Sequence, residues 1–201
     1  METDRLLAVG IAGTTAIVLA GTAAQLIGYG LLHGRVPALD SASDGGLFGL
    51  VGDISIGVAT LAAWVVLLRI RPRNIAVVTL PLLLSFLTVD KLLRFHDHIP
   101  GWLVLYLPVL AATFVAIAVE ARRLSLRCFR LTAVALALLV GSFLLHEYGA
   151  WLLSHLGGST TGWTYQVKAV VKHGLEVAGW LLVALGLAVG LREHDQLRGL
   201  V

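Results

Sequence analysis

The sequence has little charge and almost no cysteine. Only 13% of its 201 residues are Asp, Glu, Lys or Arg, about half of the usual quarter in soluble domains. A single cysteine, Cys128, excludes an internal disulfide and a thiolate metal cage. The sequence also contains no Lys/Arg run interleaved with aromatic residues and no phosphate-binding loop. These absences exclude a disordered chain, a disulfide-stapled domain, a nucleic-acid-binding protein and a typical soluble enzyme.

Apolar residues make up the balance. They account for 58% of the chain, and the mean hydropathy is +0.88. Six apolar runs cover residues 6–32, 47–68, 75–95, 102–119, 131–154 and 165–191. A helix of about 20 apolar residues crosses a bilayer, and these runs are too long and too evenly apolar for barrel strands. We therefore predict an all-α fold, with a single transmembrane domain of six spans over residues 1–201 embedded in the lipid bilayer.

The basic residues predict the orientation of these spans. Only Arg35 lies in a loop on one side of the bundle. Ten of the 15 Lys and Arg residues lie at the opposite ends, namely Arg5, Arg69, Arg71, Arg73, Arg122, Arg123, Arg127, Arg130, Arg192 and Arg198. Because basic loops stay inside, we expect a cytoplasmic-membrane protein with both termini cytoplasmic. The small residues 22–24 also fit a cleaved signal peptide, but the run continues to residue 32 and we expect a retained span.

Ionisable residues inside or next to the spans share the opposite half of the bundle. They end the third and fifth runs and begin the sixth, as Asp90, Lys91, Arg94, His96, Asp97, His146, Glu147, Lys168, Lys172, His173 and Glu176. Four Lys or Arg residues balance four carboxylates, as expected where a lone charge costs from about 3 to over 10 kcal/mol. Helical spacing predicts that Asp90, Arg94 and Asp97 share one face, and that Lys168, Lys172 and Glu176 share another.

This pattern is typical of a metal site. His96, His146 and His173 come from three different runs, with Asp97 and Glu147 as further ligands. Imidazole and carboxylate ligands suit zinc or iron. We therefore expect a metal-binding membrane protein, with a metal-dependent enzyme acting on a lipid or small molecule as one form of it. In that form Glu176 or Asp90 is a ligand or the general base.

Three alternatives remain open. The cluster is also typical of a structural ion-pair network in which Lys91, Arg94, Lys168 and Lys172 hold helices together. A proton or solute pathway would use the same Asp, Glu and His residues. Haem would need an axial pair, either His146 with His173 or His96 with His146. Glycines of the first run favour close packing in a homo-oligomer or a membrane complex. We expect Trp180 to pack or face lipid and Trp102 to belong to an interfacial aromatic belt.

Two short segments carry a resemblance. The segment 90–97, DKLLRFHD, resembles the D-E-x4-H-E signature of small uncharacterised bacterial polytopic membrane proteins. The segment 172–179, KHGLEVAG, is similar to their E-E-x-x-E-x-x-G helix. The resemblance implies that Asp90, His96, Asp97 and Glu176 are site residues. This chain departs from the signature at positions 91, 172 and 173, where basic residues replace acidic ones, and this shifts metal binding toward the histidines.

Overall fold

The computed structural model describes residues 2–33, 36–39, 46–70, 75–158 and 162–198. Its six long helices are α1 (Glu2–Leu26), α2 (Leu47–Arg69), α3 (Ile75–Leu93), α4 (Trp102–Leu124), α5 (Leu126–His155) and α6 (Trp163–Arg198). Its short helical turns are η1 (Ile27–Leu31), η2 (Pro37–Leu39) and η3 (Phe95–His98). No strand occurs in these ranges. The predicted all-α fold is confirmed.

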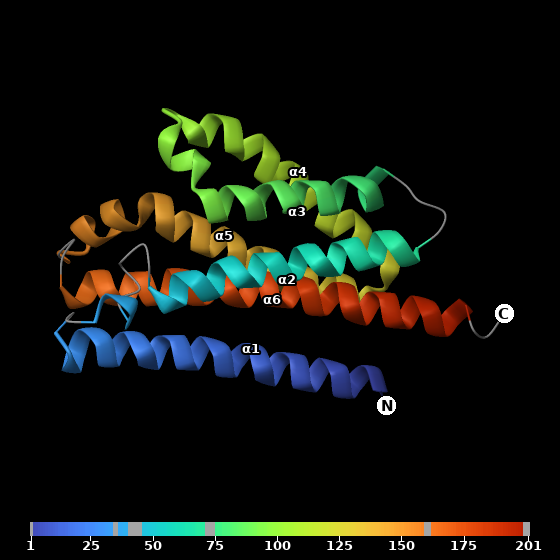
Figure 1. Ribbon diagram of the computed structural model, residues 1–201, viewed down its shortest axis with the longest axis horizontal. Helices are drawn as coiled ribbons and strands as arrows, with labels where there is room; N and C mark the ends of the chain where they lie inside the picture. Colours follow the sequence, from blue (N-terminus) through green and yellow to red (C-terminus); the bar gives the residue numbers. More distant parts are fainter. Residues whose placement is uncertain (1, 34–35, 40–45, 71–74, 159–161, 199–201) are drawn as a thin grey trace.

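Within the described ranges, six helical segments are long and apolar enough to cross a membrane, as the sequence predicts. The chain passes back and forth along the bundle, so that both termini lie at one end (Figure 1). We name this the terminal end and the opposite one the distal end. The turns η1 and η3, the end of α5 and the start of α6 lie at the distal end.

The helices extend beyond the apolar runs. α4 continues past residue 119 to Leu124, and α5 begins at Leu126 rather than at residue 131. Only Ser125 separates them, and its hydroxyl accepts a hydrogen bond from the backbone N–H of Cys128 at 3.0 Å. Leu, Ala and Arg are strong helix formers, so the helices continue where the hydropathy falls. Of the arginines that predict the orientation, those at positions 35, 71 and 73 lie outside the described ranges.

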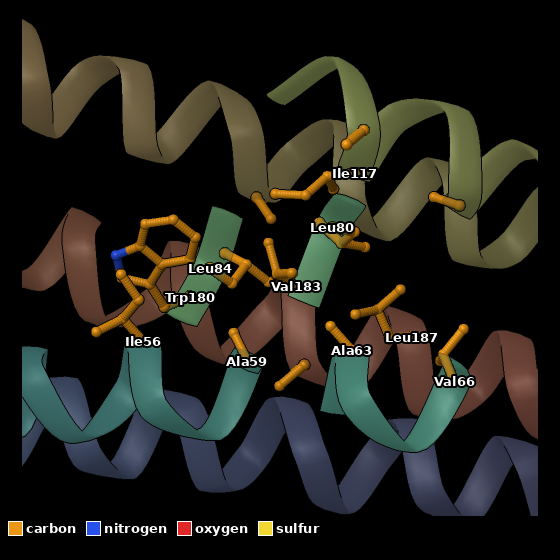
Figure 2. Packing of buried hydrophobic residues seen from close by; sticks show 14 of the residues in the cluster. Ile56, Ala59, Ala63, Val66, Leu80, Leu84, Ile117, Trp180, Val183 and Leu187 are labelled. Atoms are coloured by element: carbon orange, nitrogen blue, oxygen red, sulfur yellow. The ribbon is translucent and has the colours of Figure 1, made fainter. Parts of the chain in front are cut away.

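Helix α6 is the centre of the bundle. In its most apolar stretch 67% of the residues are buried, whereas in the most apolar stretch of the first span 0% are buried. The core is formed by apolar side chains of α2, α3, α4, α5 and α6 between the two ends of the bundle (Figure 2), including Ile56, Ala63, Leu80, Leu84, Ile117, Trp180, Val183 and Leu187. Glycine lets α5 approach α6, because a Cβ at Gly179 would lie 2.6 Å from Leu139 Cγ.

Polar contacts fasten the peripheral helix α1 at both of its ends. At the distal end, the buried amide of Gln25 donates a hydrogen bond to Gln166 of α6. At the terminal end, Asp4 accepts a hydrogen bond from Arg127 at 2.9 Å. In a bilayer, where apolar helix faces are solvated by lipid, such polar contacts determine which face of a peripheral helix packs inward.

Candidate functional site

A cavity of about 400 Å³ lies in the distal half of the bundle, mainly between α3, α4, α5 and α6. We call it the distal pocket. Its polar lining consists of Asp90, Lys91, His96, Tyr106, Ser142, His146, Lys172 and Glu176. Its apolar lining includes Leu87, Leu107, Leu110, Phe114, Leu139, Val140 and Trp180. The volume falls within the range of about 300–1,000 Å³ that is typical of small-ligand sites.

Asp90 connects three elements at the distal end of α3. Its Oδ1 accepts hydrogen bonds from the Tyr106 hydroxyl at 2.5 Å and from the backbone N–H of His96 at 3.0 Å. Its Oδ2 lies 2.7 Å from His96 Nδ1. The His96 ring also packs against Trp102 and Tyr106, with centroid distances of 5.2 and 5.9 Å. One buried carboxylate thus holds α3, η3 and α4 together and orients an imidazole that lines the pocket.

The backbone conformation at Arg94 makes this arrangement possible. Arg94 adopts the left-handed conformation, with φ of 53° and ψ of 40°, which is uncommon for a non-glycine residue. It ends α3 and turns the chain back, so that His96 lies beside Asp90. The predicted face shared by Asp90, Arg94 and Asp97 is therefore wrong, because the helix does not continue through residue 94. Asp97 Oδ1 instead lies 3.2 Å from His96 Nε2 and is exposed.

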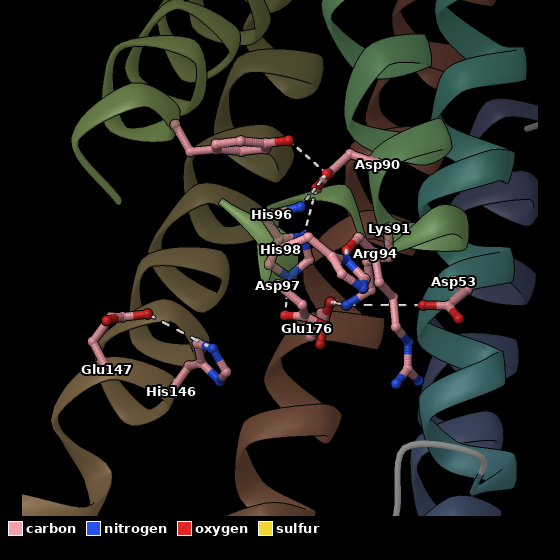
Figure 3. Close-up of polar contacts among 11 residues, drawn as sticks. Asp53, Asp90, Lys91, Arg94, His96, Asp97, His98, His146, Glu147 and Glu176 are labelled. Atoms are coloured by element: carbon pink, nitrogen blue, oxygen red, sulfur yellow. Dashed lines mark hydrogen bonds and ion pairs between the residues drawn. The ribbon is translucent and has the colours of Figure 1, made fainter. Parts of the chain in front are cut away.

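A second group of charges joins α2, α3 and α6. The Lys91 ammonium forms an ion pair with Glu176 and lies 3.9 Å from Asp53 Oδ1 (Figure 3). The other Glu176 oxygen lies 3.7 Å from His173 Nδ1, which is beyond hydrogen-bond distance. Glu176 is buried. The backbone carbonyl of Lys172 accepts a hydrogen bond from Ser142 at 2.9 Å.

The remaining predicted residues lie at the edge of the site or outside it. His146 Nε2 is 3.7 Å from Glu147 Oε1, and the His146 side chain is 49% exposed. The Lys168 ammonium lies over the Tyr165 ring, 5.1 Å from its centroid. Arg94, Glu147 and Lys168 do not belong to the pocket lining. Histidine 173 packs against Phe48, at 5.9 Å between ring centroids, and does not line the pocket either.

The three histidines expected to bind one metal ion do not form a single set of ligands. His96 contacts Asp90 and Asp97, whereas His146 and His173 each lie nearest a different glutamate. A zinc site needs several ligand atoms at about 2.0–2.2 Å from one point. Across the described ranges, no three His, Cys, Asp or Glu residues are arranged in this way. The structure thus gives no support to the expected zinc or iron site. The spacing of the histidines along the sequence does not determine the lateral distances between the helices that carry them.

Sequence patterns missed several residues of the site. Tyr106, Ser142 and Trp180 line the pocket, and Trp102 packs on His96 rather than acting only as an interfacial anchor. Tyr106 follows Trp102 at four-residue spacing, so a shared helix face was readable from the sequence. Glu120, left outside the predicted fourth span, is wholly buried in α4 of the terminal half, with Arg123 Nη1 at 3.8 Å.

Comparisons with known proteins leave the function to be argued from the site. No protein-family model matches the chain, and no curated protein or solved structure is significantly similar to it. A fold of six membrane helices supports many unrelated activities, so the geometry and chemistry of the distal pocket carry the functional argument.

Proposed function

We propose that this membrane protein binds a lipid-like amphiphile in the distal pocket, with the polar head group among the ionisable residues and the chain against the apolar walls. The observation that carries the proposal is the division of one cavity into a polar part and an apolar part. A ligand with both characters would satisfy both parts at once.

The polar part lies nearer the distal end. On α6, Lys172, Glu176 and Trp180 line the pocket at four-residue spacing, with each step about 6 Å along the helix axis. On α5, which runs toward the distal end, the apolar Leu139 precedes His146. The same trend holds on α3 and α4, so polarity decreases toward the middle of the bundle. An amphiphile in a bilayer leaflet has the same orientation, with its head at the interface and its chain inward.

The pocket also opens toward the surroundings of the bundle. Leu107 of α4 is 52% exposed and Val140 of α5 is 42% exposed, yet both line the cavity. Ala111 of α4 is likewise an exposed lining residue. Near this opening, α4 and α5 diverge toward the distal end (Figure 1). Because apolar helix faces contact lipid, this opening supports lateral entry from the bilayer.

The proposed orientation places the pocket in the outer leaflet. The exposed Arg residues of α4 and α5 gather at the terminal end, among them Arg122, Arg123 and Arg127. The positive-inside rule then makes the terminal end cytoplasmic, in the cytoplasmic membrane of the cell. The half of the bundle between the pocket and the termini is filled mainly by apolar core side chains, including Ile117, Val183 and Leu187, with Glu120 as a single buried carboxyl among the described residues. This packing favours a binding site over a continuous transport path.

A matched pair of substitutions tests the proposal. Ala111 lines the pocket, whereas its neighbour Ala112 is exposed and does not line it. The full-length protein in detergent micelles is incubated with a mixture of single-chain oleyl amphiphiles and analysed by native mass spectrometry. Ala111→Trp fills the cavity and should reduce bound amphiphile about tenfold or more, the equivalent of ~1.4 kcal/mol. Ala112→Trp should bind like the wild type.

Folding is monitored alongside binding. Circular dichroism and size-exclusion chromatography identify a variant that has lost its structure, and a smaller filling substitution, Ala111→Leu, then replaces the tryptophan. If the folded variants at positions 111 and 112 retain equal amounts of amphiphile, the bound amphiphile lies outside the distal pocket. In that case the charged cluster would hold the helices together without binding a ligand.

A further inference from the structure

The charges around the distal pocket define the head group it accepts. Resting on the proposed function, we infer that the pocket selects an amphiphile with an uncharged, hydroxylated head group, such as that of a monoacylglycerol, over anionic and cationic amphiphiles of the same chain.

The charged residues of the lining cancel one another. The lining contains two carboxylates, Asp90 and Glu176, and two ammonium groups, Lys91 and Lys172. The formal sum is zero with the imidazoles neutral. The polar part of the cavity therefore has no excess charge that would require a counter-ion.

Carboxylates also accompany the basic groups from outside the lining. Asp53 Oδ1 lies 3.9 Å from Lys91 Nζ, and Asp97 Oδ1 lies 3.2 Å from His96 Nε2. Glu147 Oε1 lies 3.7 Å from His146 Nε2. An anionic head group would have to compete with these carboxylates for Lys91, His96 and His146. Bringing a net charge into such a site costs desolvation energy, which a lining whose formal charges already balance repays poorly.

A hydroxyl group fits this lining better than an ion does. It donates one hydrogen bond and accepts others. The pocket presents donors and acceptors side by side, with the Lys91 ammonium against the Glu176 carboxylate and the Tyr106 hydroxyl against the Asp90 carboxylate. A hydroxylated head group can form hydrogen bonds with both pairs without changing the charge of the site. Several hydroxyls can do so together.

The test compares three amphiphiles with the same oleyl-length chain and pH-independent charge. Monoolein is uncharged, oleyl sulfate is anionic and oleyltrimethylammonium is cationic. They compete for the full-length protein in detergent micelles, and native mass spectrometry gives the share of each. With the wild type, monoolein should exceed each ion about tenfold.

Two variants change the charge of the lining, of which Glu176→Gln is isosteric and Lys172→Gln replaces the ammonium by an uncharged amide on a shorter side chain. Glu176→Gln makes the formal sum +1 and should raise the share of oleyl sulfate several-fold. Lys172→Gln makes the sum −1 and should raise that of oleyltrimethylammonium. If Glu176→Gln fails to fold, Asp90→Asn makes the same change of charge.

The outcomes separate this inference from the proposal beneath it. Wild-type binding of oleyl sulfate or oleyltrimethylammonium at least as strong as that of monoolein overturns the uncharged head group and leaves the amphiphile site intact. If the charge variants bind the three amphiphiles in the same proportions as the wild type, the charges of this lining do not determine the selectivity. Binding of none of the three, with folded protein, overturns the amphiphile site itself.

Discussion

Replacing Tyr106 with Phe removes one hydroxyl from the distal pocket and keeps the aromatic ring. That hydroxyl donates to Asp90 Oδ1 at 2.5 Å and links α4 to α3. The two residues are 7% and 5% exposed, so water does not replace the bond easily. The distance is that of a hydrogen bond from a hydroxyl to a carboxylate, which is about twice as strong as a neutral one. We therefore expect this substitution to lower the free energy of unfolding.

The structure bounds the size of the loss. Hydrogen bonds to charged groups contribute about 1.5–3 kcal/mol in soluble proteins. Between membrane helices, double-mutant cycles average about 0.6 kcal/mol and reach about 1.7. The buried carboxylate acceptor places this bond near the upper membrane value, whereas the two contacts that Asp90 keeps with His96 prevent a larger loss. We expect about 1.5 kcal/mol, or roughly a tenfold change in the unfolding equilibrium.

A double-mutant cycle measures the bond directly. Tyr106→Phe, Asp90→Ala and the double variant are unfolded by adding a denaturing detergent to the micelles, and helicity is followed by circular dichroism. Tyr148→Phe is the matched control, because Tyr148 is 57% exposed and should leave stability unchanged. A coupling energy of about 1 kcal/mol or more is expected. Additive effects, with coupling below ~0.3 kcal/mol, would refute the proposed link between α3 and α4.

Three further predictions concern packing. Gly179→Ala should destabilise the bundle by about 1–3 kcal/mol because its Cβ meets α5, whereas Gly57→Ala, which points into open space, should be neutral or slightly stabilising in the same unfolding assay. Gln25→Leu should cost about 1–3 kcal/mol by leaving the buried amide of Gln166 without this partner; replacing both glutamines should cost less than the sum of the single changes, and strict additivity would contradict the pairing. Cys128 is wholly buried, so maleimide labelling should require unfolding, and rapid labelling of the native protein would contradict its position in the core.

The membrane spans were predictable because they depend on a local property. Hydropathy summed over about 20 residues determines whether a segment enters the bilayer, and each of the six runs passes that threshold without help from the others. The ends of the helices were less predictable. Hydropathy marks where the bilayer ends, whereas α4 and α5 continue to Leu124 and from Leu126 because their backbone hydrogen bonds persist outside it.

The composition of the candidate site was also predictable in part. Spacing along the chain brought Lys172 and Glu176 to one face of α6, and both line the pocket. The pairing of Asp90 was not predictable, because the left-handed conformation of Arg94 ends the helix there and no glycine marks the turn. Tyr106 joined the site only through the packing of α4 on α3.

The sequence by itself therefore determined that the chain forms six membrane helices and that most of the ionisable residues within them gather in one half. Both follow from the transfer of individual residues between water and lipid, which needs no knowledge of neighbouring helices. The tertiary structure alone decided that the histidines lie beside separate carboxylates and that a cavity remains between α3, α4, α5 and α6. These features depend on helix rotation, lateral distance and one backbone turn, which are properties of the packed bundle.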